Sequence, residues 1–409
     1  MPTTKPIAKS SPDQHLPALT GLRFYLALWV VIHHLSGGAR MLEPWVRSLP
    51  DPVQTFLRSG FWAVGTFFIL SGFVLARGYA DSRWNRMSLL RYGAARMARI
   101  YPVYGVSLLV IAPFAYADLF LREPSPALDA KVGLIANYIL VLQGWTGTLP
   151  FHWNTPAWSL SCELFFYLCF PLLLLVVRCS SWRRSLAAAV VALALPLVCH
   201  IGGLPDNWKP LSHLGDFLLG IATAGGYDAL VKARPRLVER GYWLYLPASA
   251  IFIVLVSEAR LVERRVQLDT LLRPLNALLL VGLALGGGAV ARLFSNSAAV
   301  LLGKASYALY ILHVPLLWWY KRSPVFRAAA PSPVGASLIF IAGAVLLSVV
   351  VFKGVEEPAN RYFRRALVSW LTPLVENGGR WCASHSHSWW CFGGWHPRHY
   401  SGSRGGQRE

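Results

Sequence analysis

Charged residues are scarce in this 409-residue chain: Asp, Glu, Lys and Arg account for 14% of it, whereas hydrophobic residues account for 55%. Because an ordinary soluble domain carries roughly 25% charged residues, this composition excludes a soluble enzyme of several domains and also excludes intrinsic disorder. The 17 Trp and 16 Tyr residues are of the kind that collects at membrane interfaces. The sequence therefore predicts an all-α, polytopic integral membrane protein.

Acidic residues are the scarcer charge, with 19 Asp and Glu against 39 Lys and Arg and a net charge of +20. A nucleic-acid-binding protein would concentrate its basic residues on one soluble face, but here they stand in short blocks between apolar segments. We therefore expect no nucleic-acid partner and interpret the blocks as topology signals and as contacts for membrane lipids or an anionic ligand. The 6 cysteines are scattered and predict no disulfide framework.

The chain divides into three regions by composition. Residues 1–16 form a polar, Pro-rich arm without the features of a cleavable signal peptide. Residues 17–365 carry the apolar segments, and residues 366–409 form a low-complexity tail that we expect to be flexible. The tail contains Cys382, His385, His387, Cys391, His396 and His399. Their spacing fits no standard zinc motif, so we predict no metal site.

We predict about ten transmembrane helices, because a span takes about 17–25 predominantly apolar residues. Residues 132–144 are apolar but too short, and are predicted to be re-entrant or interfacial. The densest block of Lys and Arg lies between Arg77 and Arg99, which favours a topology with both termini in the cytoplasm. The predicted spans are residues 19–37, 59–79, 100–121, 157–177, 185–202, 211–228, 242–257, 272–293, 298–320 and 333–355.

The first predicted span holds the ionisable residues Arg23, His33 and His34, and Arg23 and His34 share one face whereas His33 points about 80° away. On a helix, eleven steps return a side chain to within about 20° of its starting direction, about 16 Å further along the axis. Because ionisable groups at membrane depth are costly, they are functional candidates by default. A structural interpretation has about even weight: Arg23 snorkels to headgroups, and His34 bonds a neighbouring carbonyl.

A basic cluster made of Arg91, Arg96 and Arg99 precedes the third predicted span. Arg96 and Arg99 are three residues apart, so they face the same way on a helix. Forked guanidinium groups at this predicted cytoplasmic mouth suit a phosphorylated ligand. Ordinary positive-inside anchoring is the alternative.

Two further ionisable residues, Glu163 and His313, are predicted to lie in the outer half of the membrane, at a depth similar to His34. A carboxylate can orient a catalytic histidine, or it can pair with an arginine for packing alone. Three titratable groups on separate helices at one depth favour a functional site. We interpret His213 and Asp216, spaced i,i+3, as a structural pair.

Several motifs in order resemble those of the membrane-bound acyltransferase family 3, over roughly residues 17–365. They are Arg23 with His34, residues 67–75 (FFILSGFVL), residues 96–102 (RMARIYP), residues 158–167 (WSLSCELFFY), residues 306–315 (SYALYILHVP) and residues 356–358 (EEP). One departure is Leu164, where many members of the family carry a second acidic residue.

This resemblance implies an integral membrane O-acyltransferase in a cell membrane of the bacterial inner-membrane type. Members transfer an acyl group, most often acetyl, from cytosolic acyl-CoA to hydroxyl groups of sugars and related acceptors. The implied partners are acyl-CoA as a donor substrate, a carbohydrate or glycolipid acceptor, and proteins of polysaccharide assembly, with no permanently bound cofactor.

The resemblance also implies roles for individual residues. Arg96 and Arg99, together with Arg91, would hold the CoA phosphates, and Arg23 would position donor or acceptor. His34 would act as general base or carry the acyl group, and Glu163 would stabilise the imidazolium that forms. The candidate oxyanion stabilisers are Tyr307, His313 and Ser159, and the candidate substrate-binding residues are Ser159, Tyr307 and Trp158.

Two other classes of function compete with acyl transfer. A membrane transporter of a glycolipid or an acidic metabolite would also bury charges, but transporters typically show internal repeats and interrupted helices, and neither stands out here. A membrane scaffold or sensor without chemistry has the Cys- and His-containing tail as its only support.

Overall fold

The computed structural model describes residues 16–36, 41–122, 126–146, 153–177, 182–203, 208–259, 265–323 and 332–384, and these residues form helices and turns with no strand. The all-α prediction is thereby confirmed. In chain order the elements are α1 (Pro17–Leu35), α2 (Glu43–Val46), α3 (Asp51–Leu57), η2 (Gly60–Trp62), α4 (Ala63–Gly78), α5 (Arg86–Tyr116), η3 (Ala117–Leu121), α6 (Leu128–Ile139), η4 (Thr155–Ala157), α7 (Trp158–Val177), α8 (Trp182–Ile201), α9 (Lys209–Ser212), α10 (Leu214–Ala233), η5 (Pro235–Leu237), α11 (Tyr242–Ser257), α12 (Arg265–Leu285), α13 (Gly288–Ser295), α14 (Ser297–Arg322), α16 (Pro333–Val351), η7 (Phe352–Glu356) and α17 (Glu357–Ser384).

Within the described residues, eight helices are long and apolar enough to cross a membrane. The predicted number of about ten is therefore not confirmed. Of the remaining predicted spans, residues 242–257 form α11, which has only 16 residues, and residues 211–228 overlap α10, which carries Asp216 and Asp228. The segment predicted to be re-entrant or interfacial overlaps α6, whose 12 residues are too few to cross.

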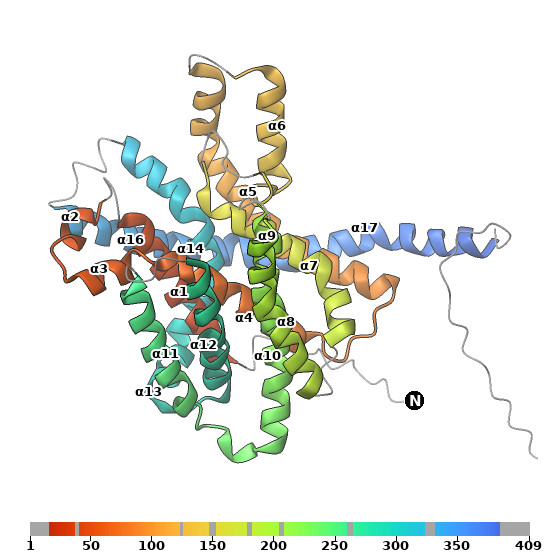
Figure 1. Cartoon of the computed structure of the whole chain (residues 1–409). Coiled ribbons are helices and arrows are strands. Elements are labelled where there is room, and N and C mark those ends of the chain that lie inside the picture. Colours follow the sequence, from red (N-terminus) through yellow and green to blue (C-terminus); the bar gives the residue numbers. More distant parts are fainter. Residues whose placement is uncertain are drawn as a thin grey trace, which may run out of the picture.

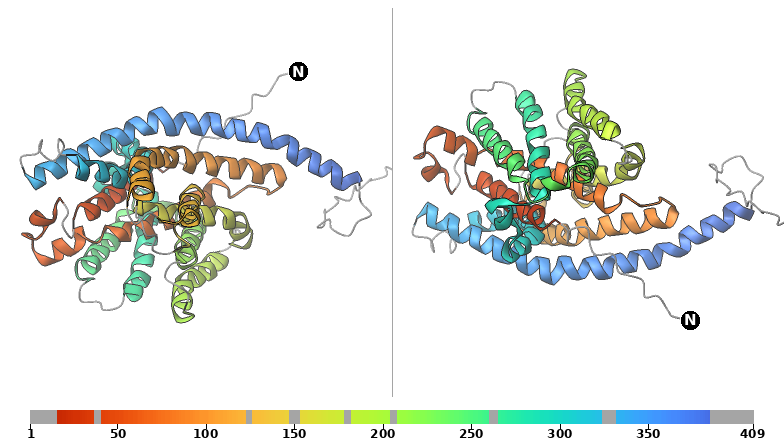
Figure 2. Two further views of the ribbon diagram at one scale, coloured as in Figure 1. Left: turned by 90° about the horizontal axis from the view of Figure 1, so that it is seen from above. Right: turned by 90° about the horizontal axis from the view of Figure 1, so that it is seen from below.

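Helices α16 and α17 form one long helix, joined through the π-helical turn η7, and α17 extends away from the rest of the bundle (Figure 1). Helix α5 runs alongside it in both views of Figure 2. Helix α17 continues past residue 365, where we expected the tail to begin, as far as Ser384. The tail histidines, at 385 and beyond, lie outside the described residues.

Glycines set how closely the central helices approach one another. Helices α1 and α14 pack along each other, and a Cβ on Gly303 of α14 would overlap the backbone carbonyl of Thr20 on α1. On α4, a Cβ on Gly72 would likewise overlap the carbonyl of Phe217 on α10. Small residues at such contacts are the usual way in which membrane helices come close. As a result, polar side chains further along α1 and α14 can meet.

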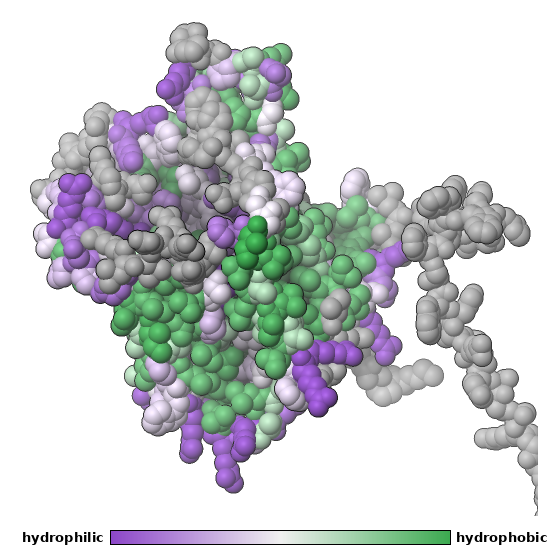
Figure 3. Space-filling model, in the orientation of Figure 1, coloured by the Kyte–Doolittle hydropathy of each residue, from purple (hydrophilic) through white to green (hydrophobic). Residues whose placement is uncertain are grey.

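The apolar surface of the bundle is consistent with a lipid environment. Large hydrophobic side chains such as Val190 and Val198 of α8 and Trp243 and Val254 of α11 are exposed. Figure 3 shows apolar residues gathered over the middle of one face, with polar residues toward its left side and its lower tip. A soluble monomer rarely exposes so extended an apolar patch, so this surface accords with a polytopic membrane protein.

Candidate active site

The central feature of the site is a contact between two histidines, His34 of α1 and His313 of α14. His313 Nε2 lies 3.2 Å from His34 Nδ1, and the two ring centroids are 4.9 Å apart. His313 is 1% exposed, whereas His34 is half-buried. Gly303 lies ten residues before His313, and Thr20, which it contacts, lies fourteen residues before His34. The two contacts follow in the same order along both helices, so α1 and α14 run in the same direction. The glycine contact therefore sets the spacing of the two imidazoles.

Neighbouring backbone carbonyls determine which ring nitrogens carry protons. His313 Nδ1 lies 2.7 Å from the carbonyl oxygen of Tyr310, and His34 Nδ1 lies 3.0 Å from that of Val30. A carbonyl oxygen only accepts, so we assign the proton to Nδ1 in both rings, and the Nδ1–H of His34 is then shared between the Val30 carbonyl and His313 Nε2. Neutral His313 then presents the lone pair of Nε2 to the Nδ1–H of His34. The same assignment leaves Nε2 of a neutral His34 as its basic nitrogen.

The sequence-predicted residues Trp158 and Ser159 begin α7, and Ser159 is connected to the helix of His313 through Tyr310. The Tyr310 hydroxyl donates to Ser159 Oγ at 3.0 Å, and the Ser159 hydroxyl donates to the carbonyl of Pro156 at 2.9 Å. Tyr310 is three residues before His313, so one face of α14 carries both side chains. We call the end of the bundle where α1 ends and α7 begins the histidine end.

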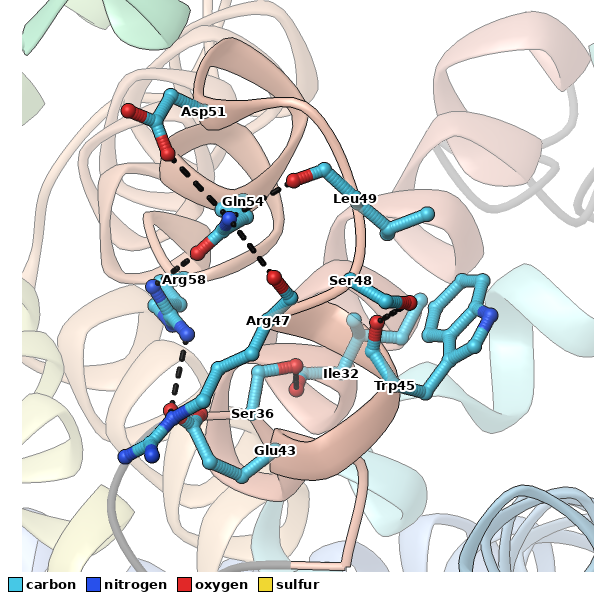
Figure 4. Close-up of polar contacts among 10 residues, drawn as sticks. All are labelled: Ile32, Ser36, Glu43, Trp45, Arg47, Ser48, Leu49, Asp51, Gln54 and Arg58. Carbon is cyan, nitrogen blue, oxygen red and sulfur yellow. Dashed lines mark hydrogen bonds and ion pairs between the residues drawn. The ribbon is translucent and has the colours of Figure 1, made fainter.

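A polar loop made of α2 and α3 is held against the histidine end (Figure 4). Buried Glu43 accepts from Arg47 Nε at 2.7 Å and from Arg58 Nη2 at 2.9 Å. The carbonyl of Arg58 in turn lies 2.6 Å from Nδ1 of His33, the residue that precedes His34. The loop thus fixes the last turn of α1, which carries His33 and His34.

Glu163 lies one turn from Ser159 on α7, but its recorded hydrogen-bond partner is Tyr167, whose hydroxyl donates to the carboxylate. The Tyr167 ring also packs against the guanidinium of Arg96, whose Cζ is 5.4 Å from the ring centroid. Tyr92 packs against the same guanidinium at 5.8 Å. The structure therefore links Glu163 to Arg96 through Tyr167, whereas the contact to His34 that we expected from Glu163 is made by His313.

Arg99 forms an ion pair with Glu356, a carboxylate that is 1% exposed in the π-helical turn η7. Its guanidinium also lies over the ring of Tyr307, 5.1 Å from the centroid, and the Tyr307 hydroxyl donates to the carbonyl of Ile100 at 2.8 Å. Tyr307 precedes His313 on α14 by about 9 Å along the axis, at 1.5 Å per residue. The side of the bundle at Arg96 and Arg99 is called the arginine end below.

Two predicted site residues, Arg91 and Arg23, take no part in the contacts described above. Arg91 is exposed on α5. Arg23 is half-buried on α1, near the end of that helix opposite to His34.

Sequence reasoning missed Tyr310, Tyr167 and Glu356. Each was within reach of a simple signal: Tyr310 shares a helix face with His313, Tyr167 shares one with Glu163, and Glu356 belongs to a motif already noted.

Among the described residues, no group of three or more His, Cys, Asp and Glu side chains is placed to hold a metal ion.

Comparisons with known proteins agree with these features. The family model described as "Acyltransferase domain" (Acyl_transf_3) matches residues 16–353. The acyltransferase MdmB of Streptomyces mycarofaciens is 34% identical over 51% of this chain and 57% of its own length. The O-acetyltransferase OatA of Staphylococcus aureus is 22% identical over 87% of this chain and 59% of its own. The chain thus spans only about three fifths of these curated relatives. No solved structure matches.

Proposed function

The chain belongs to the acyltransferase family whose model covers residues 16–353, and we propose that it is a membrane O-acyltransferase. It would transfer an acyl group, most simply acetyl, from acyl-CoA to a hydroxyl of a carbohydrate or glycoconjugate. The choice of acetyl is supported by the name of the Staphylococcus aureus relative, an O-acetyltransferase.

The observation that carries this proposal is the contact between His313 and His34. In the proposed step, His34 Nε2 takes the proton of the acceptor hydroxyl while that oxygen attacks the thioester carbonyl carbon. The new C–O bond forms, the C–S bond breaks, and the proton held on His34 passes to the thiolate of CoA. The imidazolium formed meanwhile is stabilised by the lone pair of His313 Nε2, in the way that an orienting group serves the base of a catalytic triad.

The oxyanion of the tetrahedral intermediate needs hydrogen-bond donors. Ser159 and Tyr307 remain the candidates among the hydroxyls predicted for this role. Both already donate within the protein, to the carbonyls of Pro156 and Ile100, so either would have to exchange that partner for the oxyanion. With Nδ1 as its protonated nitrogen, neutral His313 offers a lone pair rather than a donor toward His34, so in this proposal it acts as a positioning residue instead.

The donor is proposed to enter at the arginine end, which we place on the cytosolic side. Arg96 Nε is buried and has no hydrogen-bond partner among the described residues. Arg99 is 30% exposed, so its N–H groups outside the pair with Glu356 can reach the CoA phosphates. Glu356 would orient Arg99 rather than replace the phosphate. Arg91, being exposed, would attract CoA only at long range.

The proposal is tested in inverted membrane vesicles that contain the full chain, with radiolabelled acetyl-CoA and the glycans of the expression host. Label should pass from acetyl-CoA to carbohydrate with the wild-type protein and not with His34→Ala. Since general bases contribute typically about 10²–10⁴-fold, the residual rate should be close to background. Transfer that is undiminished in His34→Ala, with equal insertion of both proteins, would overturn the mechanism.

A covalent variant uses the same residues: His34 Nε2 attacks the thioester itself, and the acyl-imidazole is then attacked by the acceptor. Rapid quenching with labelled acetyl-CoA and no acceptor distinguishes the two routes, because only the covalent route leaves label on the protein.

A further inference from the structure

A second polar network lies between α10 and α12, in a region that the proposed mechanism does not use. Arg273 of α12 donates through Nε to Asp216 Oδ1 and through Nη2 to Asp269 Oδ2, both at 2.6 Å. His213 Nδ1 lies 2.8 Å from the other oxygen of Asp216. Asp216 is 1% exposed and Arg273 is 2% exposed. We call these four residues the α10–α12 network.

The network is more than the i,i+3 pair of His213 and Asp216 that we interpreted as structural. Its centre is a buried guanidinium on another helix, which sequence spacing does not predict. Two carboxylates, Asp216 and Asp269, more than balance the single positive charge of Arg273, so the guanidinium needs no further counter-charge.

Three buried polar atoms, one in the network and two around the start of α4, have no partner among the described residues. Arg273 Nη1 has no hydrogen-bond partner among the described residues, and the same holds for Thr66 Oγ1 of α4 and Trp62 Nε1 of the preceding turn η2. Gly65, next to Thr66, lies against the network, because a Cβ there would be 3.9 Å from Asp216 Oδ2. Helices α4, α10 and α12 contact one another pairwise (Figure 1). Since buried donors are nearly always paired, these atoms point to a hydrogen-bonding ligand.

The chemistry of that ligand follows from the charge balance. Because the guanidinium is already neutralised by Asp216 and Asp269, a phosphate or carboxylate at Nη1 would add an uncompensated buried negative charge. A neutral acceptor oxygen, such as a hydroxyl, satisfies Nη1 without that cost. The side chains of Asp269 and His213 are 30% and 23% exposed, so two members of the network reach the surface, whereas Arg273 Nη1 is buried.

The network adjoins the histidine end through Trp158. The ring of His213 is 5.5 Å from that of Trp158 and 5.3 Å from that of Phe68. Trp158 is followed by Ser159, which bonds Tyr310 beside His313. A ligand that spans these positions can therefore contact the network at one part while another part reaches the histidine pair.

We propose that the α10–α12 network, with Thr66 and Trp62, binds neutral hydroxyl groups of a sugar, and so forms a subsite for the acceptor. This deepens the proposed function and rests on it for the identity of the reacting hydroxyl. Binding of a glycoside at the subsite can be tested without measuring acyl transfer.

The experiment measures the thermal stability of the full chain in lipid nanodiscs with p-nitrophenyl glucoside, p-nitrophenyl N-acetylglucosaminide, p-nitrophenyl glucuronide and inorganic phosphate. A neutral glycoside should raise the Tm of the wild-type protein, and the glucuronide and phosphate should raise it less. In Thr66→Val and Arg273→Lys, the glycoside concentration needed for half of this shift should rise about tenfold, the loss expected for one hydrogen bond to a charged or buried group.

Thr66→Val also separates binding from folding. Replacing an unpaired buried hydroxyl by a methyl group should leave the Tm without ligand unchanged or raised, even though glycoside binding weakens. Thr223→Val is the matched control, because the Thr223 hydroxyl bonds the carbonyl of Leu219 within its own helix, and it should bind like the wild type.

Three results would overturn the subsite: no neutral glycoside shifts the wild-type Tm, the anionic probes shift it more, or Thr66→Val and Arg273→Lys bind like the wild type. Failure of acetyl transfer has a different meaning. If transfer is absent while glycoside binding depends on Thr66 and Arg273, the proposed function fails and the subsite remains.

Discussion

His313 Nε2 lies 3.2 Å from His34 Nδ1, and each Nδ1 atom also faces a backbone carbonyl of its own helix. Both histidines are thus assigned the same tautomer, with the proton on Nδ1, and the Nδ1–H of His34 faces the Nε2 lone pair of His313. This relationship makes His313 a positioning residue for the proposed base.

The first prediction concerns His313. Replacement by Phe removes the lone pair that faces His34, and kcat should fall by roughly 10- to 150-fold, equivalent to about 1.5–3 kcal/mol for a hydrogen bond to a charged group. The KM values for acetyl-CoA and acceptor should change little, because neither substrate is held by His313. Steady-state kinetics in nanodiscs measure this split.

His313→Gln is the matched comparison, since its side-chain carbonyl can accept from His34 Nδ1–H. It should recover part of the kcat that Phe loses. Equal losses in both variants would argue that His313 serves only to fill space.

The second prediction concerns the glycine contact that brings the histidines together. A Cβ on Gly303 would overlap the carbonyl of Thr20, so Gly303→Ala should cost about 1–3 kcal/mol of stability through overpacking. It should also separate α14 from α1 and lower kcat by more than the loss of folded protein accounts for. Thermal unfolding and activity per folded molecule provide the two readouts.

Gly343→Ala on α16 is the control, because a Cβ there meets nothing within 4 Å. It should behave like the wild type in both measurements. Full activity in Gly303→Ala would contradict the idea that this contact sets the spacing of the imidazoles.

The third prediction separates the arginines of α5. Arg99→Lys replaces a forked guanidinium by a point charge, and the KM for acetyl-CoA should rise about tenfold, the value of one charge-assisted hydrogen bond. Arg91→Lys should leave that KM unchanged, because Arg91 is exposed and away from the cluster. The acceptor KM should be the same in both variants. An equal effect of both would favour general electrostatic attraction over a specific site.

The fourth prediction concerns Glu356, the buried partner of Arg99. Glu356→Gln leaves the guanidinium without its counter-charge, so the stability of the protein should fall, by less than the 3–5 kcal/mol typical of a fully buried pair because Arg99 is 30% exposed. If Glu356 only orients Arg99, the double variant Glu356→Gln with Arg99→Met should be more stable than Glu356→Gln alone. A double-mutant cycle by thermal unfolding tests this.

Sequence reasoning recovered the class of fold because composition is a property of the whole chain. A low content of charged residues together with repeated apolar segments predicts a polytopic helical bundle. The number of about ten spans is not confirmed. Helix α10, which overlaps one predicted span, carries the buried Asp216, and this carboxylate is neutralised by Arg273, a partner from a different helix. Hydropathy along one segment does not report such a partner.

The candidate site shows the same division. Periodicity and motifs predicted His34, His313, Arg96 and Arg99, since each is an ionisable residue in or beside an apolar helix. Their pairing was predicted less well: Glu163 was expected beside His34, yet Tyr167 and Arg96 are its neighbours, and His313 occupies the expected position. A side chain one helical turn away can make such a contact instead. Which side chain faces a given neighbour depends on the rotation of the helix about its own axis, and all of the packing partners of the helix set that rotation.

The sequence by itself therefore determined the helical membrane class, the family resemblance and the list of chemically competent residues, because these depend on residue type and on spacing along one helix. Only the tertiary structure decided which of these residues meet. The histidine pair depends on the contact of Gly303 with Thr20, the Arg99–Glu356 pair on the packing of α5 against η7, and the unpartnered Arg273 Nη1 on the contacts of α10 with α12. Each of these joins segments far apart in the chain, where local propensity carries no information about distance.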